Sequence, residues 1–192
     1  MTEPSPLELI ILGSNRVSWD LYLWFTSLEL PGRFTLYELA HRFIEEPTGD
    51  LTPIQVSWWG GEKAPPRQII LENQAFIVAF DFSDEQTFKA ARSIAIAVKK
   101  VKSKNCAMNL IGLQRRHCRL QVSLDDTTIL ANKLAVSIFS IQPQAEHKSI
   151  EAFLDLIRQC REERNSSKFP RHENRVSRMI RMIWANLFGI LS

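Results

Sequence analysis

Glycine is scarce in this chain, with 7 of 192 residues, so composition alone does not predict a glycine-rich loop that binds phosphate groups. Cysteine is scarcer still. Cys106, Cys118 and Cys160 include no CxxC pair, which argues against a zinc knuckle or a disulfide framework. We therefore expect no bound metal and a reducing environment.

Long apolar runs are also lacking. No stretch of about twenty apolar residues is present, so no helix is expected to span a bilayer. The first residues have no basic region, and the apolar run at residues 7–12 is too short for a signal peptide. We expect an intracellular protein, either cytoplasmic or peripheral at a membrane.

Most of the chain has no excess of positive or negative charge. The net charge is +3, but residues 168–192 alone carry five basic residues against one acidic residue. The first 167 residues therefore hold 19 basic and 20 acidic groups. Nucleic-acid-binding domains usually carry a positive face, so no nucleic acid partner is expected. A basic end favours an anionic membrane surface, an acidic partner or simple solvation.

Hydrophobic residues make up 45% of the chain, which suffices for a buried core. Short apolar runs alternate with segments of helical periodicity. The patterns predict strands at 7–12, 34–44, 52–58, 75–82, 107–112 and 135–140. They predict helices at 18–28, 85–101, 127–134 and 149–161, with at most a short helix before Leu71.

This order predicts an α/β fold with a mostly parallel six-stranded sheet, one antiparallel edge strand and helices on both faces. We expect one domain over residues 1–163, a linker over 164–173 and a separate helix over 174–192. In such sheets ligands bind beyond the carboxyl ends of the strands. The informative residues should therefore follow Leu12, Trp58, Phe82, Gly112 and Ser140.

Residues 79–88, AFDFSDEQTF, resemble the fourth strand and following turn of Ras-like small GTPases. The order and spacing of the other segments over roughly 7–162 are similar to that family as well. The resemblance implies a P-loop-NTPase-like (Ras-like) fold. The family binds GTP with Mg²⁺ through short motifs, and this chain departs from each of them.

The family's phosphate loop has glycine, four residues, then glycine, lysine and serine or threonine. Here Gly13 matches the first glycine, but Ser18, Trp19 and Asp20 stand at the last three positions. Tryptophan brings no positive charge to the phosphates, and aspartate would repel them.

The family's third motif, aspartate-x-x-glycine-glutamine, reads Ser57, Trp58, Trp59, Gly60, Gly61. Ser57 replaces the carboxylate on the metal side. Gly61 replaces the glutamine that positions water.

The guanine motif, asparagine-lysine-x-aspartate, reads Leu113, Gln114, Arg115, Arg116. Arg116 can only donate hydrogen bonds where the family's aspartate accepts them. The last motif, serine-alanine-lysine, keeps only its serine, Ser140.

The loss of these groups predicts a protein without catalytic residues and without a bound cofactor. One hydrogen bond to a charged group is worth about 1.5–3 kcal/mol. Losing three would remove about 5–9 kcal/mol, which is on the order of 10³- to 10⁶-fold in affinity. We expect a catalytically inactive pseudo-GTPase that serves as a protein-interaction subunit or adaptor in a hetero-complex. The alternative is a divergent GTPase that still binds GTP or GDP with Mg²⁺.

Two kinds of residue are candidates for interaction within the domain. Trp58 and Trp59 are neighbours in an expected strand, so their side chains should face opposite ways. Either one of them is exposed and binds a partner, or both are covered by the rest of the chain. Trp19, with Trp58, is expected to fill the vacated nucleotide pocket or to pack as an ordinary helix residue. Arg115 belongs to a basic cluster that could receive an acidic partner or lie solvated in a loop.

The segment 174–192 is expected to form an amphipathic helix with a basic face. It could bind a protein partner, lie on a membrane surface or fold back on its own domain. The final four residues include no cysteine, so no prenyl anchor is expected. The candidate interaction residues here are Arg175, Arg178, Met179, Ile183, Trp184, Leu187 and Phe188.

Overall fold

A computed structural model describes residues 6–27, 40–46, 48–49, 51–102, 106–142 and 146–166. Its sheet has six strands in the order β2-β3-β1-β4-β5-β6. Only β2 runs antiparallel to its neighbour, at one edge of the sheet. This is the predicted architecture. The strands are β1 (Leu7–Gly13), β2 (Ala40–Glu45), β3 (Leu51–Gly60), β4 (Ala75–Asp81), β5 (Ala107–Leu113) and β6 (Ser137–Ile141).

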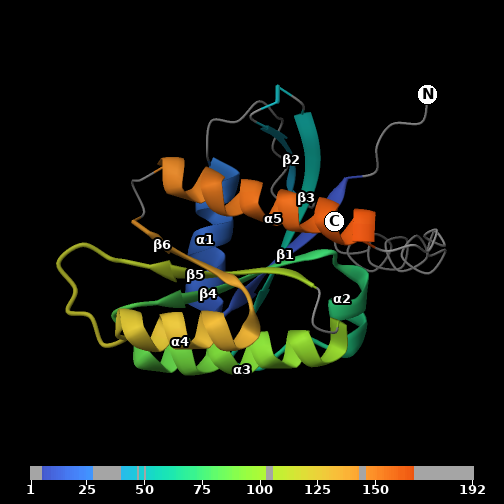
Figure 1. The fold of residues 1–192 in the computed structure, drawn as a ribbon. Helices are drawn as coiled ribbons and strands as arrows, with labels where there is room; N and C mark the ends of the chain where they lie inside the picture. The colour runs from blue at the N-terminus through green and yellow to red at the C-terminus, as the bar shows by residue number, and fades with distance from the viewer. Residues whose placement is uncertain are drawn as a thin grey trace, which may run out of the picture.

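Five helices cover the two faces of this sheet. Side chains of α1 and α5 pack in one apolar cluster, and those of α2, α3 and α4 pack in a second cluster on the other face. Figure 1 shows α5 on one side of the sheet and α3 with α4 on the other. The helices are α1 (Asn15–Ser27), α2 (Arg67–Glu72), α3 (Glu85–Lys102), α4 (Leu124–Leu134) and α5 (Glu146–Ser166).

The central strands form the core because they are apolar on both faces, as parallel strands between two helix layers must be. All seven residues of β4 and all seven of β5 are buried. In β1 the side chains alternate, with Leu9 and Ile11 in the α1–α5 cluster and Ile10 and Leu12 in the opposite one. Both helix layers therefore pack against a rigid sheet.

Several boundaries differ from the sequence prediction. Helix α1 begins at Asn15, three residues before the predicted start. Helix α4 begins earlier too, because Ser123 caps it by accepting a hydrogen bond from the Asp126 amide. Strand β6 begins later, because Ala135 takes a left-handed conformation at the end of α4.

Helix α5 continues through Ser166, three residues into the predicted linker. The rest of that linker and the predicted helix at 174–192 lie outside the described residues, as do residues 34–39 of the predicted second strand. None of the helices that the structure describes is long and apolar enough to cross a membrane.

Candidate functional site at the carboxyl ends of the strands

The connection between β1 and α1 is very short. Strand β1 ends at Gly13, Ser14 follows, and the helix begins at Asn15. The Ser18 amide donates to the Ser14 carbonyl at 2.9 Å, and the buried Ser18 hydroxyl donates to the same oxygen at 3.0 Å. The first turn of α1 is thus closed by its own hydrogen bonds.

This geometry leaves a one-residue turn where the sequence comparison placed a phosphate loop. Ser18, Trp19 and Asp20 all lie inside α1. The Ser18 amide bonds within the helix. A phosphate loop instead directs its backbone amides at the ligand.

Two glycines allow the neighbouring chain segments to approach closely. A Cβ atom on Gly13 would lie 2.6 Å from the Ala79 carbonyl oxygen, and one on Gly60 would lie 2.8 Å from the Cα atom of Asn15. The Gly61 amide donates to the Gly13 carbonyl at 2.9 Å. Close packing of β1 on β4 and of β3 on α1 therefore accounts for Gly13 and Gly60 without a ligand.

Arg115 joins three elements at this edge of the sheet. Its Nε atom donates to Oδ2 of Asp81, at the end of β4, at 2.5 Å. Its Nη2 atom donates to Oδ2 of Asp20, on α1, at 2.6 Å. The other oxygen of Asp81 accepts from the Ser83 amide at 2.8 Å and from the Ser83 hydroxyl at 2.6 Å. We call Asp20, Asp81, Ser83 and Arg115 the Arg115 bridge.

The Asp81 carboxylate is held in its charged form. Its side chain is 8% exposed. Burial acts to raise the pKa of Asp81, but the hydrogen bonds from Ser83 and Arg115 outweigh it and leave the pKa below the ordinary value. The pKa of Arg115 is raised, mainly by its hydrogen bond to Asp81 and to a smaller extent by its hydrogen bond to Asp20. The bridge is therefore ionic at neutral pH.

A hollow of about 440 Å³ lies between the starts of α1 and α3, beside the Arg115 bridge. Its charged lining residues are Arg16, Glu62, Asp81, Asp84 and Arg115. Three carboxylates thus face two guanidinium groups, which gives a net charge of −1. Such a surface repels a polyanion rather than attracting it.

Of the four residues that stand at the guanine motif, Arg115 lines the hollow, and the other three lie as follows. Leu113 is buried in the core with β5, and the Gln114 amide donates to the Ile141 carbonyl at 2.8 Å. Arg116 is exposed, and Ser140 is a half-buried residue of β6 paired with Gly112. At the third motif, the Ser57 hydroxyl donates to the Leu9 carbonyl at 3.4 Å.

A family model described as the Ras family matches residues 63–162. The chain belongs to the Ras family. The match begins after β3 and covers α2, β4, α3, β5, α4, β6 and most of α5. It leaves out β1, α1, β2 and β3, the elements on which the family's phosphate and metal motifs would stand. A comparison with curated proteins finds no match.

In this Ras-family chain the tryptophans of β3 face opposite ways, as predicted. Trp58 is 37% exposed, and its ring lies 4.9 Å from that of Trp19, also 37% exposed. Trp19 in turn stacks on Tyr22 at 5.6 Å. Trp59 packs against the cluster on the other face. We call Trp19, Tyr22 and Trp58 the aromatic patch.

Neither Trp19 nor Trp58, the residues predicted to fill a vacated nucleotide pocket, lines this hollow. Trp19 packs against Tyr22 and Trp58 instead. The strand ends are joined instead by Arg115. The guanidinium of Arg115, a predicted contact for an acidic partner, is engaged by two carboxylates of the same chain.

The remaining members of the basic cluster, Arg116, His117 and Arg119, are exposed. Within the described part of the chain, no group of three or more His, Cys, Asp or Glu side chains could hold a metal ion. The seven candidate residues between Arg175 and Phe188 lie outside the described residues.

Asp81 and Ser83 are the site residues that sequence reasoning missed. Both belong to the segment AFDFSDEQTF, and Asp81 is the charged residue that ends a strand of otherwise apolar residues. A carboxylate in that position requires a partner. That requirement was the available signal, but it did not identify Arg115.

Proposed function

We propose that this Ras-family chain is a pseudo-GTPase, a protein-interaction subunit or adaptor in an intracellular hetero-complex that neither binds GTP in the family's manner nor hydrolyses it. The observation that carries the proposal is the one-residue connection between Gly13 and Asn15. A loop that encircles a phosphate needs several residues with free amides. Here the amide at the glycine position, that of Ser18, is bonded within α1.

Electrostatics support the same conclusion. Asp20 stands where the family has a hydroxyl near the metal, and Arg115 is neutralised by Asp20 and Asp81. The adjoining hollow carries more carboxylates than guanidinium groups. A triphosphate in this hollow would lie beside the carboxylates of Asp81 and Asp84, which repel it.

The aromatic patch supports a role in protein binding. Tryptophan and tyrosine are enriched among the residues that dominate binding energy at interfaces. Trp19 and Trp58 lie in contact on α1 and β3, and each keeps more than a third of its surface exposed. We propose this patch as a contact for a protein partner, with the segment 174–192 as a second tether.

A thermal unfolding experiment tests the loss of nucleotide binding. The purified full chain is heated with and without millimolar GTP and MgCl₂. A ligand present far above its Kd stabilises the folded state by several kcal/mol. An unchanged Tm supports the proposal, and a rise of several degrees contradicts it.

Affinity capture tests the aromatic patch. Full chains with Trp58→Ala or with Ile129→Ala, an exposed apolar residue of α4 on the opposite face, are compared with the wild type by mass spectrometry. The proposal expects a specific partner to be lost only from Trp58→Ala. If the Trp58→Ala variant retained all partners, the aromatic patch would not be a binding surface for them.

The second candidate function is a divergent GTPase that still binds GTP or GDP with Mg²⁺. Membership of the Ras family favours it, as does a hollow of about 440 Å³ at the ligand-binding edge of the sheet. Under this alternative the protein would be a regulatory switch. The Tm experiment separates the two functions, because only a switch is stabilised by GTP with magnesium.

A further inference from the structure

A second hollow, of about 570 Å³, runs along one flank of α5. We call it the α5 groove. Its lining residues Glu151, Leu154, Asp155 and Arg158 recur three or four positions apart, so they form one stripe on the helix. Phe139 of β6 lies in the same hollow. A groove beside a helix of 21 residues suits a second helix.

The α5 groove combines an apolar floor with a negative rim. Phe139 and Leu154 are partly buried and pack against the α1–α5 core cluster. The groove also contains four carboxylates, those of Glu46, Glu151, Asp155 and Glu162, and two guanidinium groups. Its net charge is therefore −2.

The two guanidinium groups of the α5 groove are already paired. Arg161 bonds to Glu46 at 2.5 Å, and Arg158 bonds to Asp155. Glu151 and Glu162 are both exposed. These two carboxylates give the rim its excess negative charge.

One segment of this chain has the matching chemistry. Residues 168–192 carry a net charge of +4. Within them, Val176, Ile180, Ile183, Leu187 and Leu191 recur at helical spacing, which predicts one apolar side. The groove and the segment are thus complementary in charge and in apolar character.

The connection between them has a suitable length. The segment follows directly from α5, which ends at Ser166, four residues after Glu162 of the groove. Residues 167–173 can span roughly 23 Å when extended. That is enough for the chain to reverse and for a helix at 174–192 to return antiparallel to α5.

We propose that residues 174–192 bind in the α5 groove of their own chain when no partner holds them. In an antiparallel arrangement Arg175, which flanks the apolar side of the helix, would come near Glu162, and the later apolar residues near Leu154 and Phe139. The interaction would keep the tether bound to its own domain until a partner competes for it. It is separate from nucleotide binding, so its failure would leave the proposed function standing.

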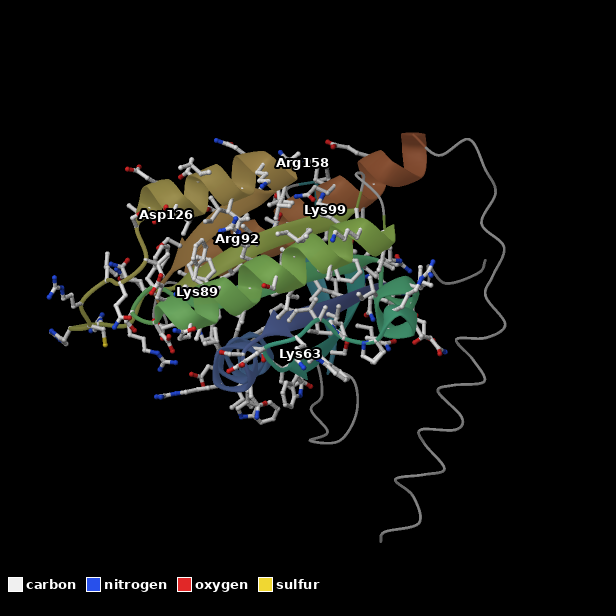
Figure 2. All side chains as sticks on the ribbon, turned by 90° about the horizontal axis from the view of Figure 1, so that it is seen from below. Lys63, Lys89, Arg92, Lys99, Asp126 and Arg158 are labelled. Atoms are coloured by element: carbon white, nitrogen blue, oxygen red, sulfur yellow. The ribbon has the colours of Figure 1, made fainter. Side chains whose placement is uncertain are left out.

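Hydrogen–deuterium exchange of the purified full chain, read by mass spectrometry, tests this proposal. The tail variant is Arg175→Glu with Arg181→Glu, the two arginines that flank the apolar side of the helix. The control variant makes the same charge change at Arg92 and Lys100, two exposed residues of α3 on the opposite face of the sheet. Figure 2 places Arg92 on α3 and Arg158 on α5.

The proposal expects amides of residues 151–162 to exchange several-fold faster in the tail variant and at the wild-type rate in the control variant. Adding Glu151→Lys and Glu162→Lys to the tail variant exchanges the charges of the two sides and should restore the slow rate. This rescue distinguishes docking from a general loss of stability.

Three results would overturn the proposal. They are wild-type exchange at 151–162 in the tail variant, an equal effect of the control variant, and failure of the charge exchange to restore protection. Protection that increases with protein concentration would assign the α5 groove to a second copy of the chain. That outcome would also overturn docking within one chain.

Discussion

At the scale of single residues, Arg115 holds the strand ends together. Its guanidinium bonds to one carboxylate on β4 and one on α1. We expect Arg115→Met to lower the free energy of unfolding by about 1.5–3 kcal/mol, the worth of a hydrogen bond to a charged group. The exposed neighbour offers a matched control, and Arg116→Met should change stability by less than about 0.5 kcal/mol. Urea unfolding of both variants measures the difference, and equal stabilities would refute the role of the bridge.

Asp81 makes this bridge dependent on pH. Burial of the side chain acts to raise the pKa of Asp81, but the hydrogen bonds from Ser83 and Arg115 outweigh burial. The pKa of Asp81 is therefore lowered in the folded protein. The stability that it contributes is therefore fully present above its unfolded pKa of about 4 and is lost as the pH falls through the folded value. We expect the stability difference between wild type and Asp81→Asn to shrink below pH 4. Unfolding titrations at pH 7, 5 and 3 measure it, and a difference that is constant with pH would contradict this assignment.

The sequence could not predict the Arg115 bridge, although Asp20 and Arg115 were singled out separately. Arg115 stands beside Arg116, which predicts a solvated basic loop. Its two partners lie 34 and 95 residues earlier in the chain. Only the convergence of β1–α1, β4 and β5 at one edge of the sheet brings these charges together, and local pattern contains no information about that contact.

At the scale of elements, α1 approaches β3 so closely that a longer loop does not fit between Gly13 and α1. A Cβ atom on Gly60 would lie 2.8 Å from both the Asn15 Cα atom and the Trp58 ring. We expect Gly60→Ala to cost about 1–3 kcal/mol of stability through overpacking. Gly61→Ala is the control, because its Cβ atom would meet its nearest neighbour at 3.6 Å, an ordinary contact. Thermal unfolding compares the two, and equal Tm values would mean that α1 can retreat from β3.

The elements themselves were predictable where one physical signal dominated. Residues 75–82 and 107–112 are apolar runs that each contain one polar or charged residue, Asp81 or Asn109, and both form buried strands. The start of α1 was not predictable in the same way. Asn15 and Arg16 are exposed, so they contribute nothing to the apolar periodicity that marks a helix. The family's pattern of a loop after Gly13 also pointed to a later start.

At the scale of the whole molecule, the family match covers one part of the chain and not the other. Residues 63–162 match the Ras family, and they supply three parallel strands with their helices. Residues before 63 keep the order of the fold but carry a one-residue turn after β1 and the aromatic patch. The fold needs the sheet, whereas the phosphate loop is needed only by a ligand.

The most direct test of the proposed loss of nucleotide binding is the nucleotide content of the full chain purified from cells in magnesium-containing buffer. The protein is denatured, and the released nucleotides are separated and quantified against the protein concentration. We predict less than about 0.05 mol of guanine nucleotide per mol of protein, because the turn after Gly13 has one residue and Asp20 and Asp81 pair with Arg115. Recovery of GDP or GTP near one mol per mol would contradict the account and establish a divergent GTPase.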